Sequence, residues 1–122
     1  MILSIATNRT AATVRLDVTG EIDIDTVQAL SQAIAGAVDA DAGGIEINLD
    51  ATVFCACAGI NALLDGRRQA VARRIGFQVI NPNGNPLKVL LVLGLYALLT
   101  TRTTGAPAGR LTVVPVPNTA QE

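Results

Sequence analysis

The hydrophobic residues of this chain change their spacing several times, from every second position to the spacing of a helix. Ile45, Ile47 and Leu49 alternate with polar residues, which is typical of a strand with one buried face. Comparable patterns bounded by turn residues predict four further strands, at residues 3–6, 13–18, 77–80 and 111–114.

Three segments between these strands are predicted to be helices, and the first two have the apolar spacing of amphipathic helices. The expected boundary residues are Asp23 or Asp25 at the start of the first helix, Gly76 after the second, the pair Asn85 and Pro86 at the start of the third, and Gly94 after its end. The second helix is expected to run from about residue 58 to residue 75. Strands that alternate with helices predict an α/β fold, with a mostly parallel central β-sheet and helices packed against it.

The entrance to the second predicted helix contains four consecutive residues with small side chains. These residues are Ala56, Cys57, Ala58 and Gly59. Small side chains at the entrance to a helix let another molecule approach the backbone closely. We therefore take this loop, together with Phe54 before it, as the first candidate for a binding surface.

The sequence around this loop resembles the STAS domain of bacterial anti-sigma factor antagonists. In that family a strand ending in Asp leads to a loop that reads Phe, apolar, Asp, Ser, Ser or Thr, Gly, apolar, and residues 54–60 (FCACAGI) keep the frame but not the Asp and Ser. Residues 18–23 (VTGEID) resemble the family's entry to its first helix, and residues 79–81 its fourth strand. Gly94 and Leu95 match a Gly-Leu pair that follows. The resemblance covers about residues 3–116 and implies the STAS (SpoIIAA-like) fold.

The resemblance also implies a function, which is to bind an anti-sigma factor, a kinase-like protein, and so release a sigma factor by partner switching. The partner-binding loop would comprise Phe54, Ala56, Cys57, Ala58 and Gly59, with a rim formed by Gly20, Glu21 and Asp23. In the family the kinase phosphorylates the first Ser of the loop, and the added charge breaks the complex. Cys57 stands at that position here, so the resemblance implies binding without the usual phosphoswitch.

Two other functions stay open at this point. STAS subunits that dock on the ATPases of lipid-transporting ABC complexes use the helix after the same loop, so a scaffold role of that kind is the first alternative. The second alternative is a thiol-based redox sensor that uses Cys57 or Cys55. Cys57 would lie near the positive end of a helix dipole, which favours a reactive thiolate, whereas Cys55 is expected to be a small buried hydrophobic residue.

Composition limits the function further. The chain has 122 residues, half of them hydrophobic, and a net charge of -1, so it offers no basic field for nucleic acid. We expect one STAS domain at residues 1–117 and a flexible tail at residues 118–122. The amino terminus lacks the features of a secretory signal, and the longest apolar run is too short to span a membrane. These features predict a cytoplasmic protein.

The absence of histidine from the whole sequence excludes the common catalytic dyads and triads and removes the commonest metal ligand. The glycine-rich segments also lack the lysine and hydroxyl of a phosphate-binding loop. We therefore expect no catalytic residues, no metal site and no cofactor. The predicted protein is a binding module and not an enzyme.

The segment from Leu87 to Leu99 is apolar on almost every side of its predicted helix. Such a helix has to be covered. One interpretation is a more extended core, or the proline-rich carboxyl-terminal segment folding over the helix. The other is a homodimer or a protein partner that contacts Leu87, Leu91, Leu93 and Tyr96, and the sequence does not choose between them.

Overall fold

A five-stranded mixed sheet forms the centre of the computed structural model, which describes residues 2–10, 12–40 and 42–103. The strands are β1 (Ser4–Arg9), β2 (Thr13–Ile22), β3 (Gly44–Asn48), β4 (Thr52–Cys55) and β5 (Gly76–Ile80). The main order across the sheet is β1-β2-β3-β5, and β4 pairs with the end of β2. Only the β1–β2 pair is antiparallel, while the β2–β3, β3–β5 and β2–β4 pairs are parallel. The predicted α/β class and mostly parallel sheet are confirmed.

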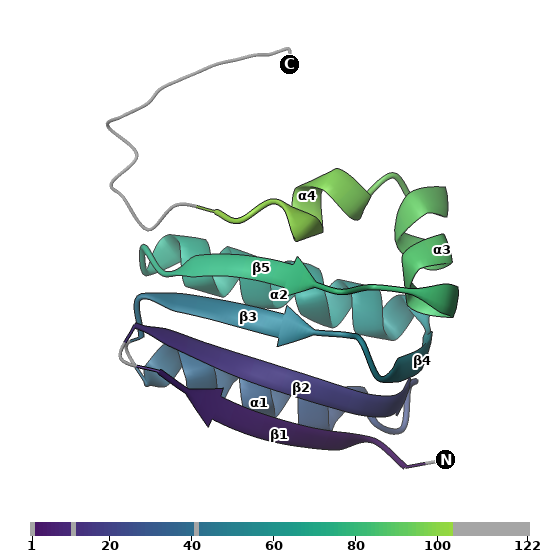
Figure 1. Ribbon diagram of the computed structural model, residues 1–122, viewed down its shortest axis with the longest axis horizontal. Coiled ribbons are helices and arrows are strands. Elements are labelled where there is room, and N and C mark those ends of the chain that lie inside the picture. Colours follow the sequence, from purple (N-terminus) through teal and green to yellow (C-terminus); the bar gives the residue numbers. More distant parts are fainter. Residues whose placement is uncertain (1, 11, 41, 104–122) are drawn as a thin grey trace.

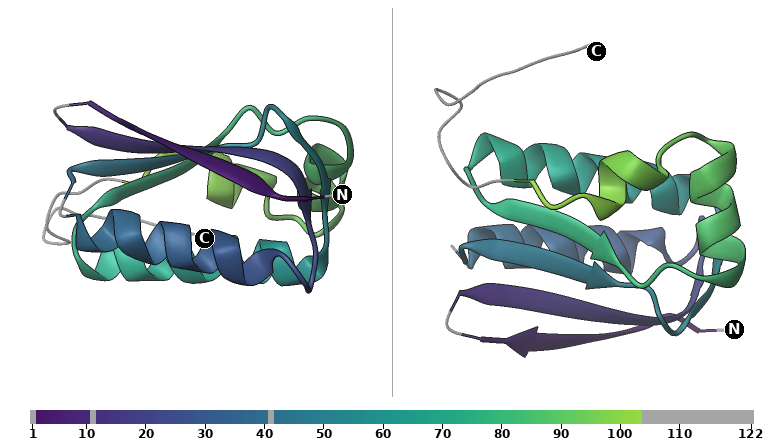
Figure 2. Two further views of the ribbon diagram at one scale, coloured as in Figure 1. Left: turned by 90° about the horizontal axis from the view of Figure 1, so that it is seen from below. Right: turned by 45° about the horizontal axis from the view of Figure 1, so that its top comes forward.

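Four helices accompany the sheet: α1 (Val27–Asp39), α2 (Cys57–Ala72), α3 (Gly84–Val92) and α4 (Tyr96–Thr100). Helices α1 and α2 lie side by side on one face of the sheet, α3 follows the end of β5 and packs against β4, and α4 lies beside β5 (Figures 1 and 2). Leu16, Ile47 and Phe77 of the sheet are buried, as are Leu30 and Leu63 of the two long helices. The core therefore lies between the sheet and the α1–α2 layer. Among the described residues, no helix is both long and apolar enough to cross a membrane.

The opposite face of the sheet carries polar side chains. On this face Asp17 accepts a hydrogen bond from Asn48 at 2.7 Å and pairs with Arg15 at 3.1 Å. Glu46 and Gln78 continue the polar row on β3 and β5, because alternate residues of a strand point to opposite faces. This pattern explains why the alternation of apolar and polar residues located these strands correctly.

Strand β4 was not predicted, because residues 52–55 were expected to belong to a loop. Thr52 and Cys55 are buried whereas Val53 and Phe54 are exposed, so the segment lacks the alternation of a strand. It becomes a strand through parallel pairing with β2, where Glu21 faces Phe54. Strand β2 accordingly extends to Ile22, so Gly20 and Glu21 belong to a strand and not to a loop.

Several predicted helix boundaries were wrong. Helix α2 ends at Ala72, and the left-handed residue after it is Arg74, with φ of 60°. Gly76 instead begins β5, where an added Cβ would lie 3.1 Å from the carbonyl oxygen of Thr103. Gly94, with φ of +71°, does occupy the left-handed position after α3, as predicted. Helix α4 follows it and was not predicted as a separate element.

The starts of α1 and α3 also differ from the prediction. Thr26 is the N-cap residue of α1, and Asp23 holds the preceding turn by accepting hydrogen bonds from the backbone N–H groups of Asp25 and Thr26. Asn83 is the N-cap residue of α3, which begins at Gly84, before the expected pair. Asn85 is therefore free to use its side chain elsewhere.

The end of the described chain is bound to the outer edge of β5. Thr103 donates its backbone N–H to the carbonyl oxygen of Phe77 at 3.0 Å, and its hydroxyl accepts the N–H of Phe77 at 2.8 Å. The predicted strand at 111–114 and the predicted tail at 118–122 lie outside the described residues.

Candidate functional site

The parallel strands β2 and β4 position the start of α2. Ile22 faces Cys55 in the β2–β4 pair, and the backbone N–H of Ala56 donates to the carbonyl oxygen of Ile22 at 2.8 Å. The hydroxyl of Thr52 is buried and donates to the carbonyl oxygen of Val18 at 2.8 Å. Because of these bonds, the first turn of α2 is fixed to the end of the sheet. We call the surface formed by Phe54, Ala56, Cys57 and Ala58 the α2 entrance.

The α2 entrance has no side-chain cap. Ala56 is the N-cap residue with an extended backbone, and no side chain among the described residues caps the helix. The carbonyl oxygen of Ala56 accepts the N–H groups of Gly59 and Ile60, at 2.9 and 3.2 Å. The N–H groups of Cys57 and Ala58 precede these bonds and so belong to the orphan donors that every helix start presents. The entrance combines small side chains with the positive end of the α2 dipole.

The structure separates the two cysteines. Cys57 is exposed at the first position of α2, whereas Cys55 is buried and only 1% exposed. Burial, and to a smaller extent a charge on Cys57, raises the pKa of the Cys55 thiol to about 11. Cys55 therefore fits its expected role as a small hydrophobic residue and is a poor nucleophile at neutral pH. The exposed thiol is the one that the resemblance aligns with the phosphoacceptor position.

Gly59 does not belong to the accessible surface, contrary to the expectation that it would let a partner approach. It is buried, and an added Cβ would lie 2.6 Å from Cγ2 of Ile22 and 2.7 Å from Sγ of Cys55. Its lack of a side chain lets α2 pack closely on the end of the sheet.

The expected rim is only partly accessible. Gly20 is buried and has φ of +111°, and a Cβ added there would overlap the carbonyl oxygen of Ile2. Gly20 therefore packs inside the protein and does not form part of an accessible rim. Glu21 and Asp23 are half-buried, and the Asp23 carboxylate is already engaged in the turn before α1. Glu21 faces Phe54 in the β2–β4 pair, and Asp23 lies in the turn before α1.

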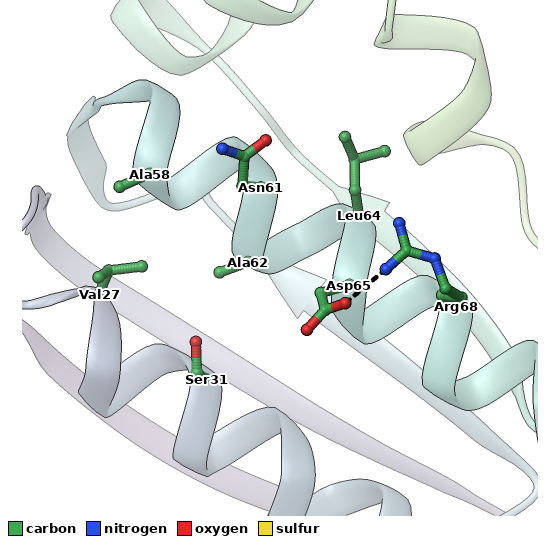
Figure 3. A pocket seen from close by; sticks show the side chains of 8 residues that line it. All are labelled: Val27, Ser31, Ala58, Asn61, Ala62, Leu64, Asp65 and Arg68. Carbon is green, nitrogen blue, oxygen red and sulfur yellow. Dashed lines mark hydrogen bonds and ion pairs between the residues drawn. The ribbon is translucent and has the colours of Figure 1, made fainter.

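A groove of about 500 Å³ lies between α1 and α2 on one side of the entrance. Figure 3 shows Val27 and Ser31 of α1 facing Ala58 and Ala62 of α2 across it, while Asp65 and Arg68 of α2 form an ion pair. The remaining lining residues are Asn61 and Leu64. This groove was not predicted from the sequence, although Ala58 and Ala62 stand one helical turn apart and are the small residues that leave space for it.

A second groove, of about 370 Å³, lies between the entrance and α3. Its lining combines Cys57 with Asn85, Lys88, Val89, Val92 and Leu93. Most of these side chains are apolar, and Lys88 is the charged residue among them. The segment from Leu87 to Leu99 was predicted to form an apolar helix, but only the packing of α3 against β4 shows which side of it faces Cys57.

Asn85 connects the two sides of this second groove. Its side-chain oxygen accepts the backbone N–H of Cys55 at 2.9 Å, so α3 is hydrogen-bonded to β4. The expected use of Asn85 as a helix cap was wrong for this reason. The arrangement places a thiol, a cation and an apolar wall around one uncapped helix start.

Comparisons with known proteins agree with this architecture. A family model described as "Mlab, STAS domain" matches residues 5–100. An anti-sigma factor antagonist from Mycobacterium paratuberculosis has a crystal structure that superposes with a TM-score of 0.72 at 24% identity, covering 80% of this chain and 82% of that one. The anti-sigma factor antagonist SpoIIAA in its unphosphorylated form gives a TM-score of 0.67 at 22% identity, covering 80% of this chain and 86% of that one.

The phosphorylated form of the Bacillus cell fate determinant SpoIIAA is also similar, with a TM-score of 0.60 at 22% identity over 80% of this chain and 89% of that chain. A search of the curated proteins found no match. At these identities the solved structures show a shared fold. Together with the matched family model, they confirm the fold that the sequence motifs implied.

Proposed function

This chain belongs to the STAS domain family, and from that membership we propose that it is a non-enzymatic binding protein that engages an anti-sigma factor through the α2 entrance and so releases a sigma factor. The observation that carries the proposal is the exposed, uncapped first turn of α2, with Cys57 on it and an accessible groove on each side. The similar structures described as anti-sigma factor antagonists support the choice of partner.

The charges around the entrance suit a protein partner with both signs of charge. Glu21 and Asp23 lie on the α1 side, and Lys88 lies in the apolar groove on the α3 side. Complementary charges on a partner would fix its orientation more than they would add affinity. Phe54 is exposed next to Cys57 and offers an aromatic contact at the centre.

We further propose that phosphorylation does not control this binding. Cys57 replaces the acceptor hydroxyl, and no Ser or Thr occurs between residues 53 and 60. The nearest hydroxyl, on Thr52, is buried and bonded to Val18, so a kinase has no access to it in the folded protein. Binding would then be constitutive, or would respond to a signal other than phosphoryl transfer at this position.

The test measures binding of a purified anti-sigma factor kinase to the wild-type chain and three variants. Cys57→Asp places a carboxylate where the family places a phosphate, and we expect it to weaken binding by roughly tenfold or more. The same carboxylate favours the start of a helix, so lost binding would not reflect an unfolded α2. Cys57→Ser should bind like the wild type, and the kinase should now phosphorylate it.

The matched control is Gln69→Glu, which adds one negative charge at an exposed position of α2. Twelve residues of helix separate it from Cys57, which corresponds to about 18 Å. We expect it to bind like the wild type. Equal binding by Cys57→Asp and the wild type would place the interface elsewhere and contradict the proposal.

A scaffold role on the ATPase of an ABC transporter is the second candidate, because the groove between α1 and α2 flanks the same helix that such subunits are expected to use. Binding of a purified ABC ATPase, with no binding of the anti-sigma factor, would favour this candidate. Asn61→Arg, a substitution in that groove, should then weaken the complex with the ATPase.

A further inference from the structure

The residues between Leu87 and Leu98 leave an unusual number of large apolar side chains in contact with solvent. Leu91 is 57% exposed, Leu93 46%, and Tyr96 and Leu98 40% each. Together with the half-buried Leu87, these residues form what we call the α3–α4 face. Both helices lie at one edge of the molecule, beside β5 (Figure 1).

We propose that the α3–α4 face pairs with the same face of a second copy of this chain. The proposal goes beyond the binding of an anti-sigma factor and does not depend on it. The face shares Leu93 with the groove next to Cys57, but Leu87 and Leu91 do not line that groove, whereas Val89 and Val92 do. Helix α3 is thus apolar on two sides, and the two proposed surfaces meet at Leu93.

The size of the face agrees with a modest homodimer. Leu91, Leu93, Tyr96 and Leu98 are each at least 40% exposed, and a contiguous apolar patch of roughly 300–600 Å² often marks an interaction site. A standard interface buries about 800 Å² on each partner, with an apolar centre and a polar rim. The α3–α4 face supplies such a centre, with Tyr96 as an aromatic residue of the kind that interfaces favour.

The charge of the segment favours a second copy as the occupant. From Val89 to Thr101 the sequence contains no charged residue, and Lys88 lines the groove on the other side of α3. In a two-fold dimer the same patch meets itself, so any charge within it would lie close to its own copy. An uncharged face avoids that repulsion. It also offers no charged side chain with which a charged partner could form an ion pair.

The chain's own carboxyl-terminal residues are a poorer fit for this face. The described chain leaves at Thr103, which is bound to Phe77 near the start of β5, whereas α3 begins shortly after the end of that strand. The large aliphatic side chains beyond Thr103 are Leu111, Val113, Val114 and Val116. They are fewer than the apolar side chains of the face, and the chain sets out from the opposite end of β5.

The experiment is sedimentation equilibrium of the full chain over a range of concentrations. We expect a mass twice the monomer's 12.6 kDa at high concentration, and dissociation on dilution. The double variant Leu91→Lys, Leu98→Lys should be monomeric throughout, because it brings like charges together across the two-fold axis. Both positions are exposed, so far-UV circular dichroism should be unchanged.

The matched control is Ile24→Lys, which replaces an exposed apolar residue in the turn before α1, outside the face. It should dimerise like the wild type. A wild-type chain that stays monomeric at every concentration would overturn the proposal, and this is the result expected if residues 104–122 cover the face. A dimer that survives the double substitution would overturn it as well, because the interface would then lie elsewhere.

Discussion

The side-chain oxygen of Asn85 lies 2.9 Å from the backbone nitrogen of Cys55 and accepts its hydrogen bond. This bond joins α3 to β4, two elements that are 30 residues apart in the sequence at this point. Cys55 is buried, so its N–H would otherwise lose its contact with water without compensation. The same bond keeps one wall of the groove beside Cys57 in place.

We therefore expect Asn85→Ala to lower the free energy of unfolding by about 1–3 kcal/mol, the usual cost of leaving a buried donor unsatisfied. Urea unfolding measures this loss. Asn85→Asp keeps an acceptor oxygen and should retain most of the stability. Hydrogen exchange at the Cys55 amide should accelerate in Asn85→Ala and stay slow in Asn85→Asp, and equal exchange in both would show that the bond contributes little.

Gly59 and Gly36 give a matched pair of predictions about glycine. An added Cβ at Gly59 would meet Ile22 and Cys55 at 2.6 and 2.7 Å, so Gly59→Ala should destabilise the fold by about 1–3 kcal/mol through overpacking. A Cβ at Gly36 in α1 would meet nothing within 4 Å, and Gly36→Ala should stabilise the fold by about 0.5–1 kcal/mol. Denaturant unfolding of both variants checks this. Equal effects of the two substitutions would contradict the packing described for Gly59.

The sequence predicted the main strands and helices because each has one buried face. Strands β2, β3 and β5 and helix α1 show this in their spacing, and the change to helical spacing near Ile60 located α2. Strand β4 escaped prediction because its pairing partner is the end of β2, and Val53 and Phe54 point to solvent. Because β4 forms through pairing with a strand that is distant in the sequence, its own residues do not show the alternation of apolar and polar side chains that predicts a strand.

The candidate site was predicted in outline but not in detail. Cys57 was correctly expected near the start of a helix, and Phe54 is exposed beside it. Gly59 and Gly20 were misinterpreted, because a sequence shows that a residue lacks a side chain but not which atoms fill the space. The role of Asn85 was missed because its bond depends on how α3 packs against β4.

The two thiols should react at very different rates. Cys57 is exposed, so a thiol reagent such as DTNB should modify it rapidly in the folded protein. Cys55 is buried and should react only when the protein opens. Mass spectrometry of partly labelled protein distinguishes the two sites, and Cys57→Ser should abolish the fast phase. Rapid labelling of Cys55 in that variant would show that the end of β4 opens readily.

Stability should fall at alkaline pH because of Cys55. Burial raises the pKa of this thiol from its ordinary 9.0 to about 11, so above pH 9 the unfolded state releases the proton that the folded state keeps. Fewer protons bound to the unfolded state mean that stability decreases as the pH rises through this window. Thermal unfolding between pH 8 and pH 11 measures the slope. The loss of stability per pH unit should be smaller in Cys55→Ala than in the wild type. The control variant Cys57→Ser, which keeps the buried thiol, should still lose stability in this range.

The buried hydroxyl of Thr52 should contribute to both stability and the shape of the α2 entrance. It donates to the carbonyl oxygen of Val18 at 2.8 Å and so joins the first residue of β4 to β2. Thr52→Val keeps the shape but removes the donor, and we expect a loss of about 1–2 kcal/mol in urea unfolding. Thr19→Val, at an exposed position of β2, should change stability by less than about 0.5 kcal/mol. Because Thr52 is buried and cannot contact a partner directly, weaker partner binding by Thr52→Val would mean that the bond between β4 and β2 is needed to hold Cys57 in position. Unchanged binding would mean that the first turn of α2 keeps its position without this bond.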